Sequence, residues 1–165
     1  MEIGQDEREH VLFLRQALGS AAVAKPAINL SALSTGFGDE SQFLALARDF
    51  EDVGVSAYGG AAPLLVNKTF LGYAAQILAT EAEHVGNVRL QIARLNIPTT
   101  PLDSKDVLPP PSGTQFMSNN AHGLSVTRTP GQVLYIVYGF VANVTQGGFF
   151  HNGVNGVINM SSGPP

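Results

Sequence analysis

One short motif, Glu-x-x-His, occurs twice in this chain and constrains its fold more than any other feature. The copies lie 74 residues apart, and the match extends to neighbouring positions. The matched positions are Glu7, Glu9, His10, Val11 and Arg15 in the first copy, and Glu81, Glu83, His84, Val85 and Arg89 in the second. Residues i and i+3 share one face of a helix, so each copy presents a carboxylate beside an imidazole. Such groups are costly in an apolar core unless they are paired, and a divalent metal between two helices would pair them.

The composition is that of a folded chain and excludes several classes of partner. Hydrophobic residues make up 44% of the 165 residues and charged ones only 13%, which argues against disorder. The net charge of −4 and the absence of a basic run disfavour nucleic-acid binding. The chain has no cysteine, so disulfides, thiolate zinc sites and iron–sulfur clusters are excluded.

Neither a membrane span nor an export signal is expected from the sequence. No apolar run reaches the roughly 18–20 residues that a transmembrane helix needs. The opening residues, 1–6, are polar and acidic, unlike a signal peptide. The compartment is therefore left unassigned.

Apolar spacing and capping residues predict three long helices. Their expected ranges are 2–18, 40–60 and 69–96. Gly19 suits the end of the first, and Asp39 with Gln42 forms a capping box for the second. The third should stop before Pro98, because the residue preceding proline avoids helical geometry. A long irregular connection over 20–38 is expected to cross from one end of the bundle to the other.

The second predicted helix carries an isolated acidic residue on its apolar face. Leu44, Ala47, Val55 and Tyr58 fall along one side of this helix, and Glu51 interrupts that series. We therefore add Glu51 to the candidate metal ligands. Tyr58 either donates a hydrogen bond to a ligand carboxylate or fills the core with its hydroxyl in water.

Glycine is unusually frequent in the same helix. Gly54, Gly59 and Gly60 would each weaken an isolated helix by about 1 kcal/mol. Tertiary packing must favour them, and close approach of another helix is one reason to expect glycine there.

Beyond the helices, residues 98–165 predict a Pro- and Gly-rich extension that packs on the bundle. Within it, Thr129–Gln132 predicts a capping box and a short helix near 130–139. We expect Phe149 and Phe150 to anchor the glycine-rich end of this extension to the bundle.

Several segments together resemble a known family over nearly the whole chain. These are residues 6–11, 50–63 and 80–85, with 129–133 and 147–150 in the extension. The sequence is similar to the ferritin-like family that includes desiccation-related proteins. The resemblance implies an all-α ferritin-like bundle and a dinuclear carboxylate site for iron or manganese.

The resemblance also implies a role for each candidate ligand. Glu7 and Glu81 would bridge two metal ions, Glu51 would bind at one end, and His10 and His84 would complete the two coordination shells. The family's first helix, which supplies a sixth ligand, has no counterpart in this sequence. Residues 1–97 therefore predict a truncated bundle of three long helices, with an incomplete site and an uncovered apolar face that favours a homo-oligomer.

Two functions remain open from the sequence. One is a metal-binding ferritin-like protein, tied by resemblance to stress or desiccation, with enzymatic turnover undecided. The alternative is a metal-free structural or protective helical protein that acts through self-association or partner binding.

The remaining polar residues of the two motifs have plainer expected roles. Glu9 and Glu83 lie on a different helix face from the ligands and should be solvated or paired with arginine. Arg15 and Arg89 are either partners of the ligands or surface residues.

Overall fold

The computed structural model describes residues 2–33 and 36–164, and their regular secondary structure is helical. The α-helices of this part are α1 Glu2–Leu18, α2 Glu40–Ala61, α3 Lys68–Arg94 and α4 Pro130–Val137. Short 3-10 turns at Gly19–Ala21, Leu30–Ala32 and Ala62–Leu64 interrupt the connections. The chain is thus all-α, as the sequence predicts.

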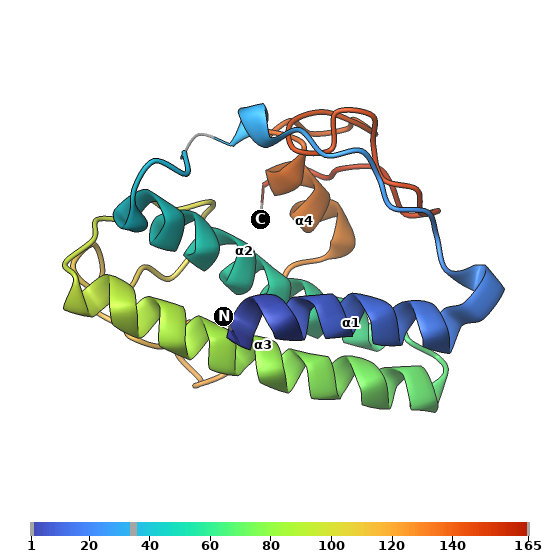
Figure 1. Ribbon diagram of the computed structural model, residues 1–165, viewed down its shortest axis with the longest axis horizontal. Coiled ribbons are helices and arrows are strands. Elements are labelled where there is room, and N and C mark those ends of the chain that lie inside the picture. Colours follow the sequence, from blue (N-terminus) through green and yellow to red (C-terminus); the bar gives the residue numbers. More distant parts are fainter. Residues whose placement is uncertain (1, 34–35, 165) are drawn as a thin grey trace.

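The three long helices lie side by side (Figure 1). The helices α2 and α3 form the most extensive helix pair, and α1 runs along α3 in the opposite direction. The short helix α4 packs on α2, on the side away from α3. The connection between α1 and α2 passes over α4 and the C-terminal loops, as expected for a crossover.

Side-chain caps fix where the helices start. The Asp39 carboxylate accepts the backbone N–H of Gln42 at 2.8 Å, and Asn67 accepts those of Thr69 and Phe70. The predicted box at Thr129 is complete, since the Thr129 hydroxyl accepts from the Gln132 backbone and the Gln132 side chain accepts from the Thr129 N–H. These caps satisfy N–H groups that have no partner within their own helix.

The helix ends differ slightly from the predicted ones. The helix α3 stops at Arg94 rather than Asn96, because Asn96 adopts a left-handed backbone with φ 54°. The helix α4 stops at Val137 rather than 139, because Gly139 turns the chain at φ 80°. Asparagine and glycine tolerate this geometry at low steric cost.

The apolar core sits where α3 meets the turn that follows it. Val88, Ile92 and Ile97 are buried, and Ile3 of α1 and Leu44 of α2 pack against them. This cluster joins all three long helices near one end of the bundle. The site described below lies further along the same helices.

The extension packs tightly on α2 and explains two of its glycines. A Cβ at Gly60 would collide with the backbone carbonyl of Arg128, and one at Gly59 would lie 2.9 Å from the Thr127 side chain. The expectation that another helix approaches these glycines is therefore wrong, because residues 127–128 of the extension approach them instead.

The crossover connection is held down by the end of the extension. The Asn29 N–H donates to the carbonyl of Phe149, and the Asn155 side chain donates to Ala24. The Phe149 ring stacks edge-on against Phe50 of α2 at 5.5 Å. Phe149 thus anchors the extension to α2, as predicted.

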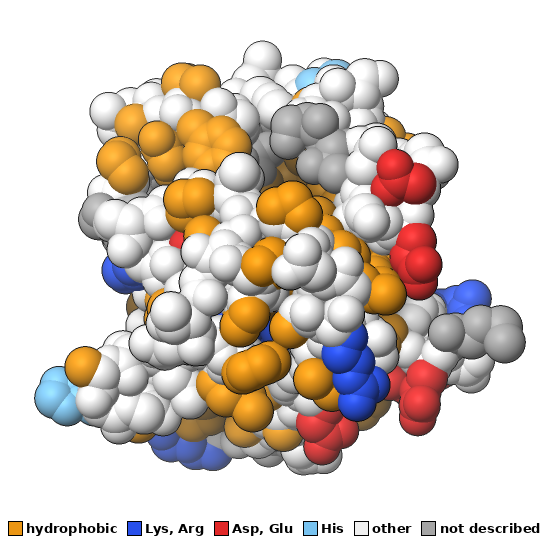
Figure 2. All heavy atoms as spheres, turned by 90° about the vertical axis from the view of Figure 1, so that its left-hand side faces the viewer, with side chains coloured by type: hydrophobic (Ala, Val, Ile, Leu, Met, Phe, Trp, Pro, Cys, Tyr) orange, Lys and Arg blue, Asp and Glu red, His pale blue; other side chains and the backbone are white. Residues whose placement is uncertain are grey.

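Many large hydrophobic side chains of the described residues are exposed. Figure 2 shows several hydrophobic patches on one face of the molecule, with charged side chains beside them. None of the helices described is both long enough and apolar enough to cross a membrane.

Candidate metal centre

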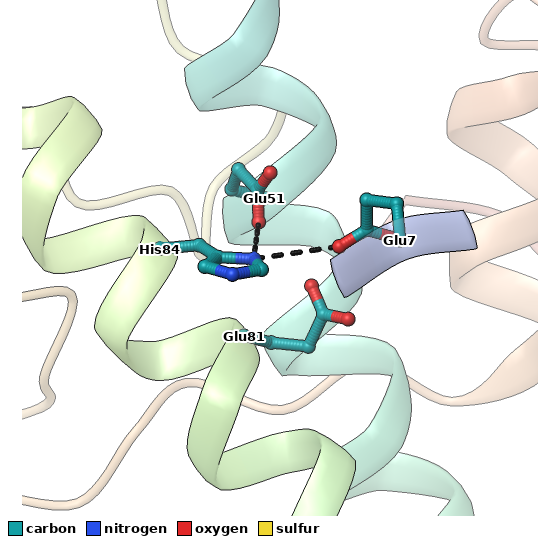
Figure 3. Close-up of side chains that lie close together, drawn as sticks. All are labelled: Glu7, Glu51, Glu81 and His84. Carbon is teal, nitrogen blue, oxygen red and sulfur yellow. Dashed lines mark ion pairs between the residues drawn. The ribbon is translucent and has the colours of Figure 1, made fainter. Parts of the chain in front are cut away.

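The three long helices bring four of the five predicted ligands to one point. Glu7 comes from α1, Glu51 from α2, and Glu81 and His84 from α3 (Figure 3). One donor atom from each lies within 4.8 Å of all the others. His10 lies beside this group, with its Nδ1 3.1 Å from Glu81 Oε1.

The four residues of this cluster differ in how far their side chains are buried. The side chains of Glu51, Glu81 and His84 are buried, whereas Glu7 is about half exposed. His84 Nδ1 lies 3.4 Å from Glu7 Oε1 and 3.5 Å from Glu51 Oε2. His10 Nδ1 lies 3.8 Å from the same Glu7 oxygen. Glu7 thus stands between the two imidazoles.

Several of the atoms that could bind a metal at this point have no hydrogen-bond partner. Four of the buried, unpartnered side-chain atoms of the described residues belong to the site, namely Glu7 Oε1, His10 Nδ1, Glu51 Oε2 and His84 Nδ1. Buried polar atoms are normally paired, so a converging unpaired set calls for a ligand. Carboxylate oxygens and imidazole nitrogens suit a first-row divalent ion, and the residues fit such a group.

Burial and mutual repulsion alter the ionisation of these carboxylates. Burial, with the charge of Glu81 nearby, raises the pKa of Glu51 to about 7. Burial and the charge of Glu7 also raise the pKa of Glu81. A divalent cation would stabilise the ionised forms that crowding disfavours.

Asp6 orients one of the two histidines. His84 Nε2 lies 3.1 Å from Asp6 Oδ2, and an ionised carboxylate only accepts, so Nε2 carries the proton. This leaves the lone pair of Nδ1 directed at the carboxylate cluster when the ring is neutral. Burial alone would lower the pKa of His84, but the Asp6 hydrogen bond and the neighbouring carboxylates outweigh it and raise that pKa.

Asp6 was not predicted as a site residue, although the two copies of the repeat differ at this position. Asp6 directly precedes Glu7, and Thr80 occupies the matching position before Glu81. Only the antiparallel packing of α1 on α3 shows that Asp6 faces a ligand on the other helix rather than its own.

Three further polar residues near the site can be compared with their predicted roles. Glu9 and Glu83 are exposed, in line with their predicted solvation. Tyr58 is half-buried, and burial with the charges of Glu81 and Glu7 raises its pKa to about 12. Its hydroxyl makes no hydrogen bond within residues 2–33 and 36–164, which favours the core-filling alternative.

The two arginines of the repeat have opposite environments. Arg15 is exposed and donates to the carbonyl of Val23. Arg89 is fully buried and donates to Asp52 at 2.7 Å and to the carbonyls of Gln115 and Phe116. Surface placement is therefore wrong for Arg89, which instead ties α3 to α2 and to the extension.

A buried ion network beside the site was also missed. Asp52, next to Glu51, pairs with Arg89 and with Arg48, and Arg48 reaches Asp106 at 2.6 Å. These groups lie at the seam between α2, α3 and the extension. No sequence period reveals them, because their partners come from residues 100–116 with no regular spacing.

The fold and the site together define a class of protein, the helical bundles with carboxylate–histidine centres. In this chain, adjacent helices direct two Glu-x-x-His pairs and a further glutamate toward one region. Comparison with protein families gives a match to the ferritin-like domain over residues 1–94, more than half of the chain. The chain belongs to this ferritin-like family. No curated protein and no solved structure matches it.

Proposed function

We propose that this chain binds two first-row divalent ions, iron or manganese, between α1, α2 and α3. The observation that carries the proposal is the set of unpartnered buried donor atoms from three helices at one point. Membership of the ferritin-like family supports it. Thiolate-seeking metals are disfavoured, because every donor is oxygen or imidazole nitrogen.

Each ligand has a role in this proposal. Glu7 and Glu81 would contribute to holding both ions, His84 and Glu51 would help to hold one of them, and His10 would help to hold the other. Bound iron or manganese would supply redox chemistry toward oxygen or peroxide. The residues of the chain would hold the ions at a half-buried site, since Glu51 and His84 are buried and Glu7 is about half exposed. A role in stress or desiccation tolerance is part of the same proposal.

Metal analysis of purified protein tests this function. Protein loaded separately with Fe²⁺ or Mn²⁺ and desalted should retain about two ions per chain, and Glu81→Ala and His84→Ala should lose them. Glu83→Ala is the matched control, since Glu83 is exposed on the same helix. A wild-type chain that retains neither metal would remove the proposal.

A metal-free structural role is the second candidate, and the surface of α1 favours it. Val11, Leu12 and Leu18 of this helix are exposed. Such side chains on neighbouring turns offer an apolar face for a second copy or a partner. Sedimentation at rising concentration distinguishes this candidate, with Leu12→Glu expected to suppress any association.

A further inference from the structure

The two halves of the site differ in how firmly each histidine is held. His84 is held through its Nε2, which is hydrogen-bonded to Asp6, while its Nδ1 lies in the carboxylate cluster. His10 has Nδ1 near Glu81 and Glu7, but its Nε2 makes no hydrogen bond in the described part of the chain. Histidine ligands are normally oriented by a partner on the second nitrogen, and losing that partner weakens metal binding.

The sequence repeat explains the difference. Asp6 packs against His84 of the other motif, and the position that matches Asp6 in the second copy of the repeat is occupied by Thr80. Thr80 carries no charge, and its hydroxyl lies 3.4 Å from the carbonyl of Gln76 in its own helix. The repeat position that matches Asp6 therefore offers no carboxylate.

The two histidines also differ in burial. The His84 side chain is 6% exposed and His10 is 16% exposed. The four donor atoms that lie within 4.8 Å of one another include His84 and exclude His10. His84 comes from α3, which has seven buried residues, whereas α1, which carries His10, has none.

From these contacts we infer that the two metal positions are unequal and fill in a fixed order. The first divalent ion binds among His84, Glu51, Glu81 and Glu7, with Asp6 as the positioning residue (Figure 3). The second binds more weakly beside His10, because no hydrogen bond in the described residues orients its Nε2 and Thr80, not a carboxylate, occupies the repeat position that matches Asp6. This inference rests on the proposed metal site.

Stepwise titration of the metal-free protein with Co²⁺, followed by absorption and calorimetry, tests the order. Wild-type protein should bind two ions with clearly separated affinities. Asp6→Ala should weaken the first step about 10- to 100-fold and shift the absorption bands of the first ion, leaving the second step unchanged. Asp6→Asn keeps an oxygen acceptor and should fall between the two.

Thr80→Asp is the complementary gain-of-function variant. It should raise the affinity of the second binding step by up to about 100-fold and leave the absorption bands of the first ion unchanged. Because it adds a group rather than removing one, it remains informative if Asp6→Ala fails to fold. Melting of the metal-free proteins checks folding, and Glu83→Gln serves as an exposed control on α3.

The outcomes separate the two proposals. Any of three results would overturn the inference and leave the metal site itself standing. They are two binding steps of equal affinity, an Asp6→Ala effect of equal size on both steps, and no effect of Thr80→Asp on the second step. No Co²⁺ binding by the wild type would overturn both.

Discussion

Glu51 places a carboxylate on an otherwise apolar helix face, and the fold changes its chemistry. Burial, with the charge of Glu81 nearby, raises its pKa from 4.5 to about 7. Below pH 7 it therefore holds a proton that a metal must displace.

Metal affinity should fall as the pH drops below about 7. Glu51 alone should weaken Co²⁺ binding by about tenfold per pH unit below 7 and have little effect above it. Calorimetry in buffers of different ionisation enthalpy should show proton release at pH 6 and less at pH 8. An affinity that stays constant between pH 5 and 7 would contradict this assignment.

The same shift has the opposite consequence for the metal-free fold. A carboxyl group with a raised pKa favours the fold below its unfolded pKa of 4.5, and this contribution is lost as the pH rises through about 7. Glu51→Gln should remove that loss, so the metal-free variant should gain stability relative to wild type at pH 8. Denaturant unfolding at pH 5 and pH 8 measures the difference.

Arg89 joins the buried ion network to the extension, because it pairs with Asp52 and donates to two carbonyls of the extension. Replacing it with methionine would leave Asp52 with only its longer contact to Arg48, at 3.4 Å, and two carbonyls without a donor. Breaking such a buried pair costs about 3–5 kcal/mol of unfolding free energy. Arg15→Met, at the matched exposed position of the repeat, should cost less than about 0.5 kcal/mol. Equal effects of the two substitutions in urea unfolding would disprove the role of the network.

Among the helices, α1 depends most on the site for its attachment. It buries no residue completely, and its contacts include Ile3 in the core and Phe13 against Tyr73 at 4.8 Å. Glu7 and His10 lie between these two anchors, so bound metal would join the middle of α1 to α2 and α3.

Metal should therefore protect α1 from hydrogen exchange more than it protects α3. At a free metal concentration about 100 times the Kd, opening of α1 should slow by up to about 100-fold. Exchange measured by mass spectrometry with and without Mn²⁺ reports this for each helix. In Glu81→Ala, α1 should exchange at the metal-free rate whether or not Mn²⁺ is present. Protection spread evenly over all helices would argue against this role.

At the scale of the whole molecule, Arg128 joins two segments of the extension to each other and to α2. Arg128 donates to both carboxylate oxygens of Asp103 at 2.7 Å, and to the Ser56 hydroxyl of α2 at 3.0 Å. Although burial alone would raise the pKa of Asp103, the hydrogen bonds and charge of Arg128 outweigh it and lower that pKa. The pair therefore favours the fold above the unfolded pKa of 3.8, and this contribution is lost as the pH falls through the lower folded value.

Acid should loosen the extension. Wild-type stability should decrease below about pH 4, and Asp103→Asn should be less stable at pH 7 but show a flatter acid dependence. Thermal melts from pH 2.5 to 7 measure both effects. A variant with the acid dependence of wild type would show that other carboxylates dominate.

The sequence by itself determined the local features of this protein. Helix positions followed from apolar spacing and caps such as Asp39 and Thr129, because those contacts form within a few residues. The candidate ligands could be predicted because Glu7, Glu51 and Glu81 interrupt apolar faces, and because the motif recurs.

Only the tertiary structure decided which residues meet across the chain. Asp6 orients His84 rather than a residue of its own helix, Arg89 lies in the core rather than on the surface, and Gly60 makes room for the extension. Asp6 and His84 are 78 residues apart in the sequence, and Gly60 and Arg128 are 68 apart. Arg89 instead has several partners at irregular distances along the sequence. Such contacts are set by how helices pack against one another, which no local periodicity records.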